Sequence, residues 1–198
     1  MFRHLQSYVP KQISEFNLKQ YAVLIPLIKE EGAYHVLFQI RAKSLSSQPG
    51  EVCFPGGKVE KNETSRDAAL RETCEELLIS KKQIQYLGPL DYLVTPYGTR
   101  IDPFLGELTN YENTYSKDEV ESIFTVPLSF FKEHKPLTFE NQLQTKIKKD
   151  FPVNLVPGGS DYPWAKGKSL VHFYEYDDHI IWGLTAKLLL QNIQNIWN

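Results

Sequence analysis

The sequence predicts an α+β fold built around a mixed β-sheet. Three observations indicate this class: several apolar or alternating runs have the length of strands, two segments repeat apolar residues at helical spacing, and few strands alternate with helices. With 198 residues, of which 41% are hydrophobic, the chain is long enough to bury one core. We therefore expect a single domain over residues 1–198, with its core at about residues 20–190.

The first half of the chain predicts a β-hairpin, a loop and a helix, in that order. Strands are expected at Tyr21–Lys29 and Tyr34–Arg41, with a turn between them. Residues 42–64 hold two Pro-Gly pairs, which indicate loop and short strand. A helix is expected over Ser65–Leu78, because Thr64 precedes Asp67 by the three residues that are typical of a helix cap.

The second half predicts further strands, a loop and a closing helix. The strands are expected at Ile84–Leu93, Ile101–Leu108, Ser122–Pro127 and Leu170–Tyr176. Thr145–Gly167 is mixed in character and is expected to be a long loop. An amphipathic helix should end the chain, because apolar residues recur there at helical spacing, at Ala186, Leu189, Leu190, Ile193 and Trp197.

Charge and hydropathy exclude several classes of protein. The net charge of -2 gives no basic field for nucleic acid. The longest apolar run, Tyr21–Ile28, is too short to span a bilayer, and the first 20 residues lack the apolar stretch of a secretory signal. Cys53 and Cys74 lack the spacing of a redox pair and are expected to be buried thiols in a reducing compartment. These features predict a soluble cytoplasmic protein that binds neither nucleic acid nor membrane.

The predicted helix carries a cluster of carboxylates. Glu72, Glu75 and Glu76 lie within roughly 100° of one another around the helix, and the apolar residues lie opposite. Like charges at this spacing repel one another, and carboxylate oxygens are ligands that suit Mg²⁺ or Mn²⁺. A divalent ion held there can clamp a diphosphate and make water more acidic. The alternative from these residues alone is an acidic face that only meets water.

The loop before the helix makes the pattern specific. Gly57, Glu63 and the run from Arg71 to Glu76 match G-x5-E-x7-R-E-U-x-E-E-x-G-U, where U is aliphatic, so this segment resembles the Nudix box. Thr73 departs from the pattern at an aliphatic position, and Leu78 replaces a glycine. Because glycine tolerates the left-handed backbone that ends helices, we expect Leu78 to lengthen or reshape the helix end.

The resemblance implies a fold, a reaction and roles for particular residues. The family's box is a loop-helix-loop on an α/β/α sandwich with a mixed sheet, and its enzymes hydrolyse nucleoside diphosphates linked to another moiety with Mg²⁺ or Mn²⁺. Glu72 and Glu76 would be the main metal ligands and Glu75 would share a second ion. The remaining implied roles are support of Arg71 or the loop by Glu63, an orienting role for Arg71, and ligand contacts from the backbone of Gly56 and Gly57.

The segment from Arg41 to Gly57 resembles the motif of coenzyme A diphosphatases, L-L-T-x-R-S/A-x3-R-x3-G-x3-F-P-G-G. Arg41, Ala42, Gly50 and Phe54–Gly57 match in register, whereas Ser46 stands where that subfamily has arginine. The resemblance implies that coenzyme A or an acyl-CoA is split into 3′,5′-ADP and 4′-phosphopantetheine or its acyl form. Arg41 is our candidate for a phosphate contact; the alternative is an arginine paired with a surface acid.

Hydrolysis also needs a base for the attacking water. Glu119 is our candidate, because the segment 118–121 resembles the acidic loop that often supplies a base in this family, and the alternative is an exposed acidic turn. His172 and His179 are further candidates. Three rival functions stay open: hydrolysis of ADP-ribose, NADH or a dinucleoside polyphosphate, a non-catalytic nucleotide sensor, and an isopentenyl-diphosphate isomerase, whose cysteine motif is not apparent. The oligomeric state, with a homodimer among the options, is also open.

Overall fold

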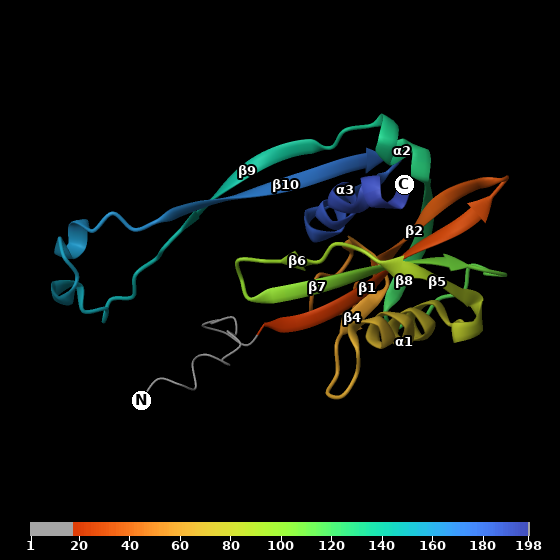
Figure 1. Cartoon of the computed structure of the whole chain (residues 1–198), viewed down its shortest axis with the longest axis horizontal. Helices are drawn as coiled ribbons and strands as arrows, with labels where there is room; N and C mark the ends of the chain where they lie inside the picture. The colour runs from red at the N-terminus through yellow and green to blue at the C-terminus, as the bar shows by residue number, and fades with distance from the viewer. Residues whose placement is uncertain (1–17, 198) are drawn as a thin grey trace, which may run out of the picture.

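The computed structural model describes residues 18–197, which form two β-sheets and the helices packed on them (Figure 1). The larger sheet contains β1 (Lys19–Glu30), β2 (Ala33–Arg41), β3 (Val52–Cys53), β4 (Gly56–Lys58), β5 (Ile84–Pro89), β6 (Leu93–Val94), β7 (Thr99–Leu108) and β8 (Val120–Pro127). The smaller sheet contains β9 (Leu137–Gln144), β10 (Lys166–Tyr176) and β11 (His179–Trp182). The helices are α1 (Ser65–Leu77), α2 (Leu128–Glu133) and α3 (Gly183–Trp197), with short 3-10 turns η2 (Lys81–Gln83), η3 (Val153–Leu155) and η4 (Gly159–Asp161).

The larger sheet is mixed, as the sequence predicts. β1 runs antiparallel to β2 and β4 but parallel to β7, along a register from Lys19–Thr99 to Leu27–Glu107. A parallel pair needs a long crossover, and α1 lies within the chain that makes it. Leu24 and Ile25 on β1 are fully buried although they point to opposite faces, which shows that the sheet is covered on both sides.

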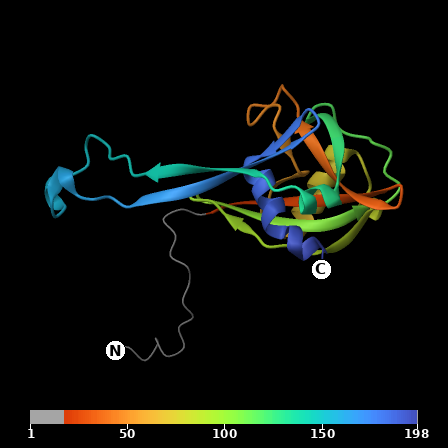
Figure 2. The same cartoon turned by 90° about the horizontal axis from the view of Figure 1, so that it is seen from above.

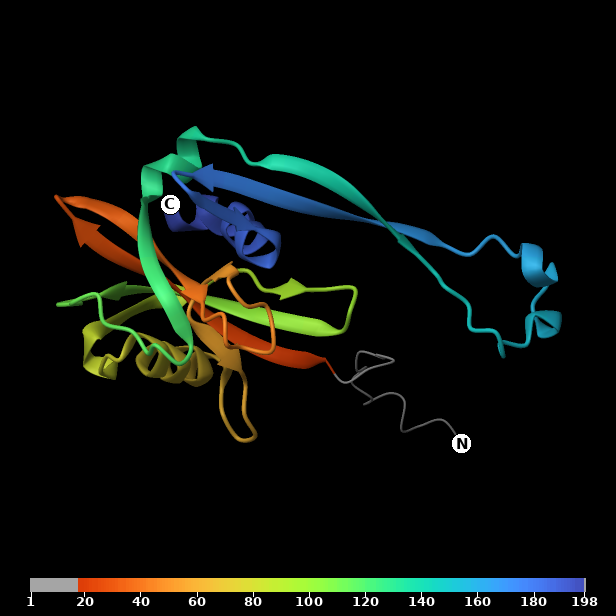
Figure 3. The same cartoon turned by 180° about the vertical axis from the view of Figure 1, so that it is seen from behind.

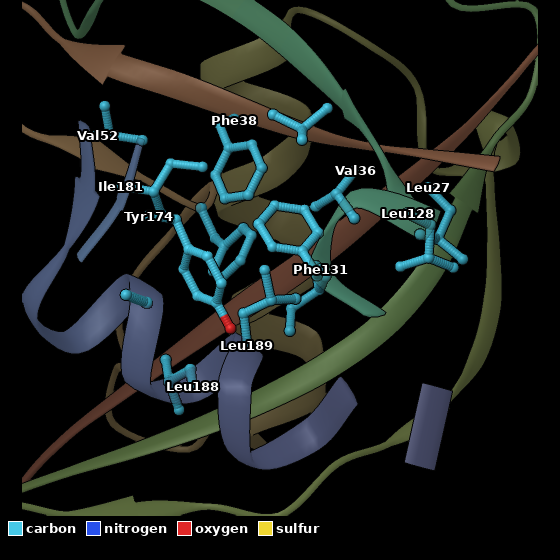
Figure 4. Close-up of a cluster of buried hydrophobic side chains, with 14 of the residues drawn as sticks. Leu27, Val36, Phe38, Val52, Leu128, Phe131, Tyr174, Ile181, Leu188 and Leu189 are labelled. Atoms are coloured by element: carbon cyan, nitrogen blue, oxygen red, sulfur yellow. The ribbon is translucent and has the colours of Figure 1, made fainter. Parts of the chain in front are cut away.

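Two apolar clusters hold the layers together. On one face of the larger sheet, α1 packs on β1 through Ala68, Ala69 and Leu77. On the other face, α2, α3 and the smaller sheet close a second cluster, and Figure 4 shows Phe38, Phe131, Tyr174 and Leu189 pointing into it. The α+β sandwich predicted from the sequence is confirmed.

Several predicted elements have different bounds in the structure. The strand expected over Ile84–Leu93 is divided into β5 and β6, and β5 ends at Pro89, which has no N–H to continue a ladder. The prediction misses α2, β9 and β11, which are short or highly exposed. The long loop is present between β9 and β10, but Lys166 and Gly167 already belong to β10.

The β9–β10 hairpin extends away from the rest of the molecule, as Figures 2 and 3 show from two directions. Its strands pair from Leu137–Phe173 near the body to Gln144–Lys166 near the tip. Between residues 18 and 197, no helix is long and apolar enough to cross a membrane. The prediction that the first 20 residues are not a secretory signal concerns residues that lie mostly outside the described part of the chain.

Helix α1 begins as predicted and ends differently. The N–H of Asp67 donates to Thr64 Oγ1 at 3.1 Å, which caps the first turn. The helix stops at Leu77 because Leu78 itself adopts the left-handed conformation, with φ 53° and ψ 44°, and its N–H donates to the carbonyl of Cys74. The expectation that the missing glycine would lengthen or reshape the helix end is therefore wrong. Leu78 keeps the usual ending at a cost in strain of about 1–2 kcal/mol.

This strain gives a stability prediction. Leu78→Gly is expected to have a higher free energy of unfolding than Leu78→Ala, by about 1 kcal/mol, because both variants remove a 60% exposed side chain but only glycine relieves the left-handed backbone. Urea denaturation of the two variants measures the difference. Equal stabilities would show that Leu78 carries no backbone strain.

Candidate active site

A cavity of about 630 Å³ opens where the larger sheet, α1 and the loop after β2 meet. The side chains that line it come from regions far apart in the sequence and include three carboxylates. Its lining consists of Tyr21, Val23, Arg41, Leu45, Ser47, Gln48, Gly56, Gly57, Lys58, Glu72, Glu76, Thr99, Ile101, Glu119 and Leu184. The structure therefore brings Arg41, Glu72, Glu76 and Glu119, which the sequence predicts as site residues, to one place.

Two glycines on β4 make room for this arrangement. β4 pairs with β1, with Gly56 opposite Val23 and Gly57 opposite Ala22. A Cβ at position 56 would collide with the backbone of Ala22 and Val23, and a Cβ at position 57 would collide with the carboxylate of Glu72. The first glycine lets β4 approach the sheet, and the second leaves the space that the Glu72 carboxylate occupies.

Glu76 lies at the buried end of the cavity, with only 4% of its surface exposed. Its Oε2 accepts hydrogen bonds from the Gly56 N–H and from Gln39 Nε2, both at 2.9 Å. Burial raises the pKa of Glu76 to about 7, with further increases from Glu72 and Glu119, while the two hydrogen bonds act in the opposite direction. The alternative of an acidic face that only meets water is wrong at Glu76.

Glu72 and Glu119 complete the carboxylates of the cavity. Burial raises the pKa of Glu72, as do the charges of Glu75 and Glu119, and the hydrogen bond from Arg71 opposes this change. Glu119 precedes β8, and its carbonyl accepts from the Ala42 N–H at 2.9 Å, which ties the acidic turn to the loop after β2. The acidic turn that contains Glu119 thus faces the site.

Arg71 organises the rim of this carboxylate group. Its Nε and Nη2 donate to the two oxygens of Glu63 at 2.9 and 3.1 Å. Its Nη1 donates to Glu72 at 2.9 Å and to Glu75 at 3.1 Å. The hydrogen bonds from Arg71 lower the pKa of Glu63, and those to the glutamates raise the pKa of Arg71. Arg71 is placed to orient Glu72, and Glu63 holds Arg71 in that position.

Glu75 lies at the rim of the site and not in the cavity. Its side chain is 57% exposed, contacts Arg71, and is not among the residues that line the cavity. His172 and His179 also lie elsewhere: His172 is buried beside Thr138, and His179 packs on Phe124 with ring centroids 3.8 Å apart.

Arg41 holds the loop after β2 and faces the cavity. Its Nε donates to the carbonyl of Ser47 at 3.2 Å. Within residues 18–197 Arg41 makes no ion pair, whereas the nearby Lys43 pairs with Glu121. Arg41 therefore has no acidic partner among these residues, and its guanidinium keeps donors for an anion.

Sequence reasoning missed Gln39 and Lys58. Gln39 is fully buried on β2, and its amide binds Glu76. A signal was present, because Gln39 interrupts an apolar run from Val36 to Ile40 and buried polar residues usually have a specific partner. Lys58 follows the two glycines and adds a second cation to the cavity.

The donor set fits a divalent cation in its chemistry. Glu72, Glu76 and Glu119 are oxygen ligands that face one cavity. The charge of Glu119 raises the pKa of both Glu72 and Glu76, and the charge of Glu72 raises that of Glu76, so a cation there would relieve this repulsion. Only Oε2 of Glu76 receives the bonds from Gln39 and Gly56, which leaves Oε1 for a ligand. Across the described residues, no three His, Cys, Asp or Glu side chains already stand close enough to hold an ion.

Comparisons with known proteins give the family of the chain. The model of the NUDIX domain matches residues 18–143, more than half of the chain. The chain is 30% identical over 191 residues to the peroxisomal coenzyme A diphosphatase NUDT7 of Mus musculus, covering 92% of this chain and 72% of the relative. It is 33% identical over 189 residues to the uncharacterized Nudix hydrolase NudL of Photorhabdus laumondii, covering 94% of this chain and 89% of the relative.

A solved structure supports the fold. The MutT/nudix family protein from Enterococcus faecalis superimposes with a TM-score of 0.54 at 14% identity, over 98% of this chain and 66% of that one.

Proposed function

Because the chain belongs to the Nudix family of hydrolases, which act on nucleoside diphosphate derivatives, we propose that it cleaves the diphosphate of coenzyme A or of an acyl-CoA. The products would be 3′,5′-ADP and 4′-phosphopantetheine or its acyl form. Mg²⁺ or Mn²⁺ is the proposed cofactor, and the proposed partner is this small nucleotide rather than nucleic acid or a membrane.

One observation carries the choice of substrate. The segment from Arg41 to Gly57, whose sequence resembles coenzyme A diphosphatases, lines the same cavity as Glu72 and Glu76 of the box. Substrate selection and hydrolysis would then take place in one site. The 30% identity to the mouse coenzyme A diphosphatase supports the same substrate.

Residues in and around the cavity have different proposed roles. Glu72 and Glu76 would hold a divalent cation, which supplies positive charge to the diphosphate oxygens and makes water more acidic. Glu119 would accept the proton of the water that attacks phosphorus, and the bond from that phosphorus to the bridging oxygen would break. Arg41 and Lys58 would bind the phosphate oxygens, while Arg71, Glu63, Gly56 and Gly57 keep the carboxylates in place.

The structure gives a reason why Ser46 is compatible with this proposal. Ser46 is not among the residues that line the cavity, whereas Ser47 and Gln48 are. Arg41 and Lys58 already bring two positive charges to it. We propose that these two side chains supply the phosphate contacts that the subfamily's arginine provides at position 46.

Product analysis by mass spectrometry tests the proposal. The protein is offered coenzyme A, ADP-ribose, NADH and a diadenosine polyphosphate side by side, with Mg²⁺ or Mn²⁺. We expect coenzyme A to be cut to 3′,5′-ADP by the wild type and far more slowly by Glu76→Gln. Preference for another of these substrates would move the function to a different Nudix hydrolase, and cleavage of none would favour a nucleotide-sensing module.

Gln39 provides a prediction about the support of Glu76. Gln39→Leu is expected to require about 10–100-fold more Mn²⁺ for half-maximal activity, because it removes the donor that orients a proposed metal ligand. A metal titration of the hydrolysis rate measures this change. Cys53→Ala is the control, since it removes the second partner of the same amide and leaves its bond to Glu76. Equal metal requirements in the two variants would show that Gln39 has no orienting role.

We also propose one domain in a reducing, cytoplasmic compartment. Both cysteines are free thiols, and burial raises the pKa of Cys53 to about 11, which keeps it protonated and unreactive.

A further inference from the structure

The smaller sheet presents an apolar face to solvent. Successive residues of a strand point to opposite faces, and on β10 the buried His172 and Tyr174 point toward the core while Phe173 points outward. The pairing of β10 with its neighbours places Leu137 and Trp182 beside Phe173. The outer face of this sheet therefore carries large apolar side chains instead of the polar ones that usually face water.

The aromatic residues of this face contact one another. The rings of Phe173 and Trp182 stack at 5.8 Å with 7° between their planes, and Phe139 meets Phe173 edge-on at 5.9 Å. Phe139 is 58% exposed and Trp182 is 40% exposed. A hollow of about 530 Å³ lies over these rings. An exposed, hollowed apolar patch is typical of a binding surface.

A second hollow joins this one to the loop after β2. It measures about 440 Å³, shares Phe173, Ile180 and Trp182 with the first and is also lined by Ile40 and Pro49. Ile40 and Pro49 are the direct chain neighbours of Arg41 and Gln48, which line the active-site cavity. Leu184, two residues after Trp182, lines that cavity too. The loop after β2 and the β11–α3 junction thus contribute residues to both the second hollow and the active-site cavity.

We propose that this apolar track, formed by Ile40, Pro49, Phe139, Phe173, Ile180 and Trp182, binds the acyl chain of a long-chain acyl-CoA. The inference rests on the proposed function and names the preferred substrate class. A chain attached to a diphosphate in the active-site cavity would reach the track along the loop after β2, which contributes residues to both that cavity and the second hollow. Among the described residues, the charged side chains that line the two outer hollows are Glu51, Glu175 and Asp178, and His179 lines the second hollow with them. Three carboxylates favour a neutral chain over a second anionic group.

A chain-length series tests the inference. KM and kcat are measured for coenzyme A and for its acetyl, octanoyl and dodecanoyl thioesters. In the wild type, KM is expected to fall by about ten-fold or more from acetyl to dodecanoyl, because each methylene moved from water to an apolar surface adds to binding. Phe139→Asp and Ile180→Asp should abolish this decrease and leave the KM for free coenzyme A unchanged.

Leu155→Asp is the matched control. Leu155 is 76% exposed and lies in the segment between β9 and β10, so it adds the same charge outside the track. It should keep the wild-type dependence on chain length. An unchanged KM and kcat for free coenzyme A would show that each variant is folded.

The outcomes separate this inference from the proposed function. If coenzyme A is cleaved but KM does not depend on chain length, or if both track variants keep the decrease, the track does not bind acyl chains. A change in sedimentation of Phe139→Asp with an unchanged chain-length dependence would assign the face to a second copy of the chain. Failure to cleave any thioester, with cleavage of ADP-ribose or a dinucleotide, would overturn the proposed function itself.

Discussion

Glu76→Gln is expected to lower kcat by about 10²–10³-fold, the usual effect of removing one group that stabilises a charged transition state. Glutamine has nearly the same shape, and its side-chain oxygen can still accept from Gly56 and Gln39. What the variant loses is the negative charge at the buried end of the cavity, which we propose as a metal ligand. Rates of coenzyme A hydrolysis at saturating Mn²⁺ measure the effect.

The stability of the same variant provides an independent control. In metal-free protein the pKa of Glu76 rises from 4.5 to about 7 on folding, so the folded state binds more protons than the unfolded state between these values. The free energy of unfolding of the wild type should therefore fall as the pH rises from about 4.5 to 7, by on the order of 2–3 kcal/mol. Glu76→Gln should lack this decrease and be more stable than the wild type at pH 8.

Together, the hydrolysis rate and the free energy of unfolding test whether Glu76→Gln is inactive only because it is unfolded. A variant that is stable but inactive has lost chemistry rather than its fold. If Glu76→Gln were as active as the wild type, the buried carboxylate would serve packing alone. If Glu76→Gln were less stable than the wild type at pH 8, the Glu76 carboxylate would make a stabilising contact other than its hydrogen bonds to Gly56 and Gln39.

The spacing of the box predicts a cluster of carboxylates on one helix face, and helix geometry explains which of them line the cavity and which does not. Glu72 and Glu76 are four residues apart, which places them within about 40° on a helix, and both line the cavity. Glu75 precedes Glu76 by one residue and points about 100° away. There it meets Arg71, four residues earlier, so it lies at the rim instead of in the cavity.

The residues that sequence reasoning missed are those that reach the site through pairing of distant strands. Gln39 meets Glu76 because β2, β1 and β4 lie in one sheet with α1 packed on it, an arrangement that no local pattern encodes. The same limit applies to the fold. β9 has mostly polar, exposed residues and becomes a strand only by pairing with β10, some 25 residues later.

Gly57→Ala is expected to lower kcat/KM by about 10²-fold or more while leaving stability close to that of the wild type. The added methyl group would occupy the space of the Glu72 carboxylate. This carboxylate ends a flexible side chain, so it can turn away, which breaks its 2.9 Å bond to Arg71 and moves it from the cavity. A displacement of about 1 Å in a catalytic group can cost this much in rate. Hydrolysis kinetics and urea denaturation of the same preparation measure both quantities.

Alanine substitutions at two other glycines serve as the comparison for Gly57→Ala. Gly56→Ala should lose stability as well as activity, because its methyl group would meet the backbone of Ala22 and Val23, which cannot move without disturbing β1. Gly88→Ala should lose neither, because no atom lies within 4 Å of its added methyl group. Activity that survives in Gly57→Ala would show that the position of Glu72 does not limit the reaction. Activity lost only in Gly56→Ala and Gly57→Ala, with stability lost only in Gly56→Ala, would assign the first glycine to the fold and the second to the site.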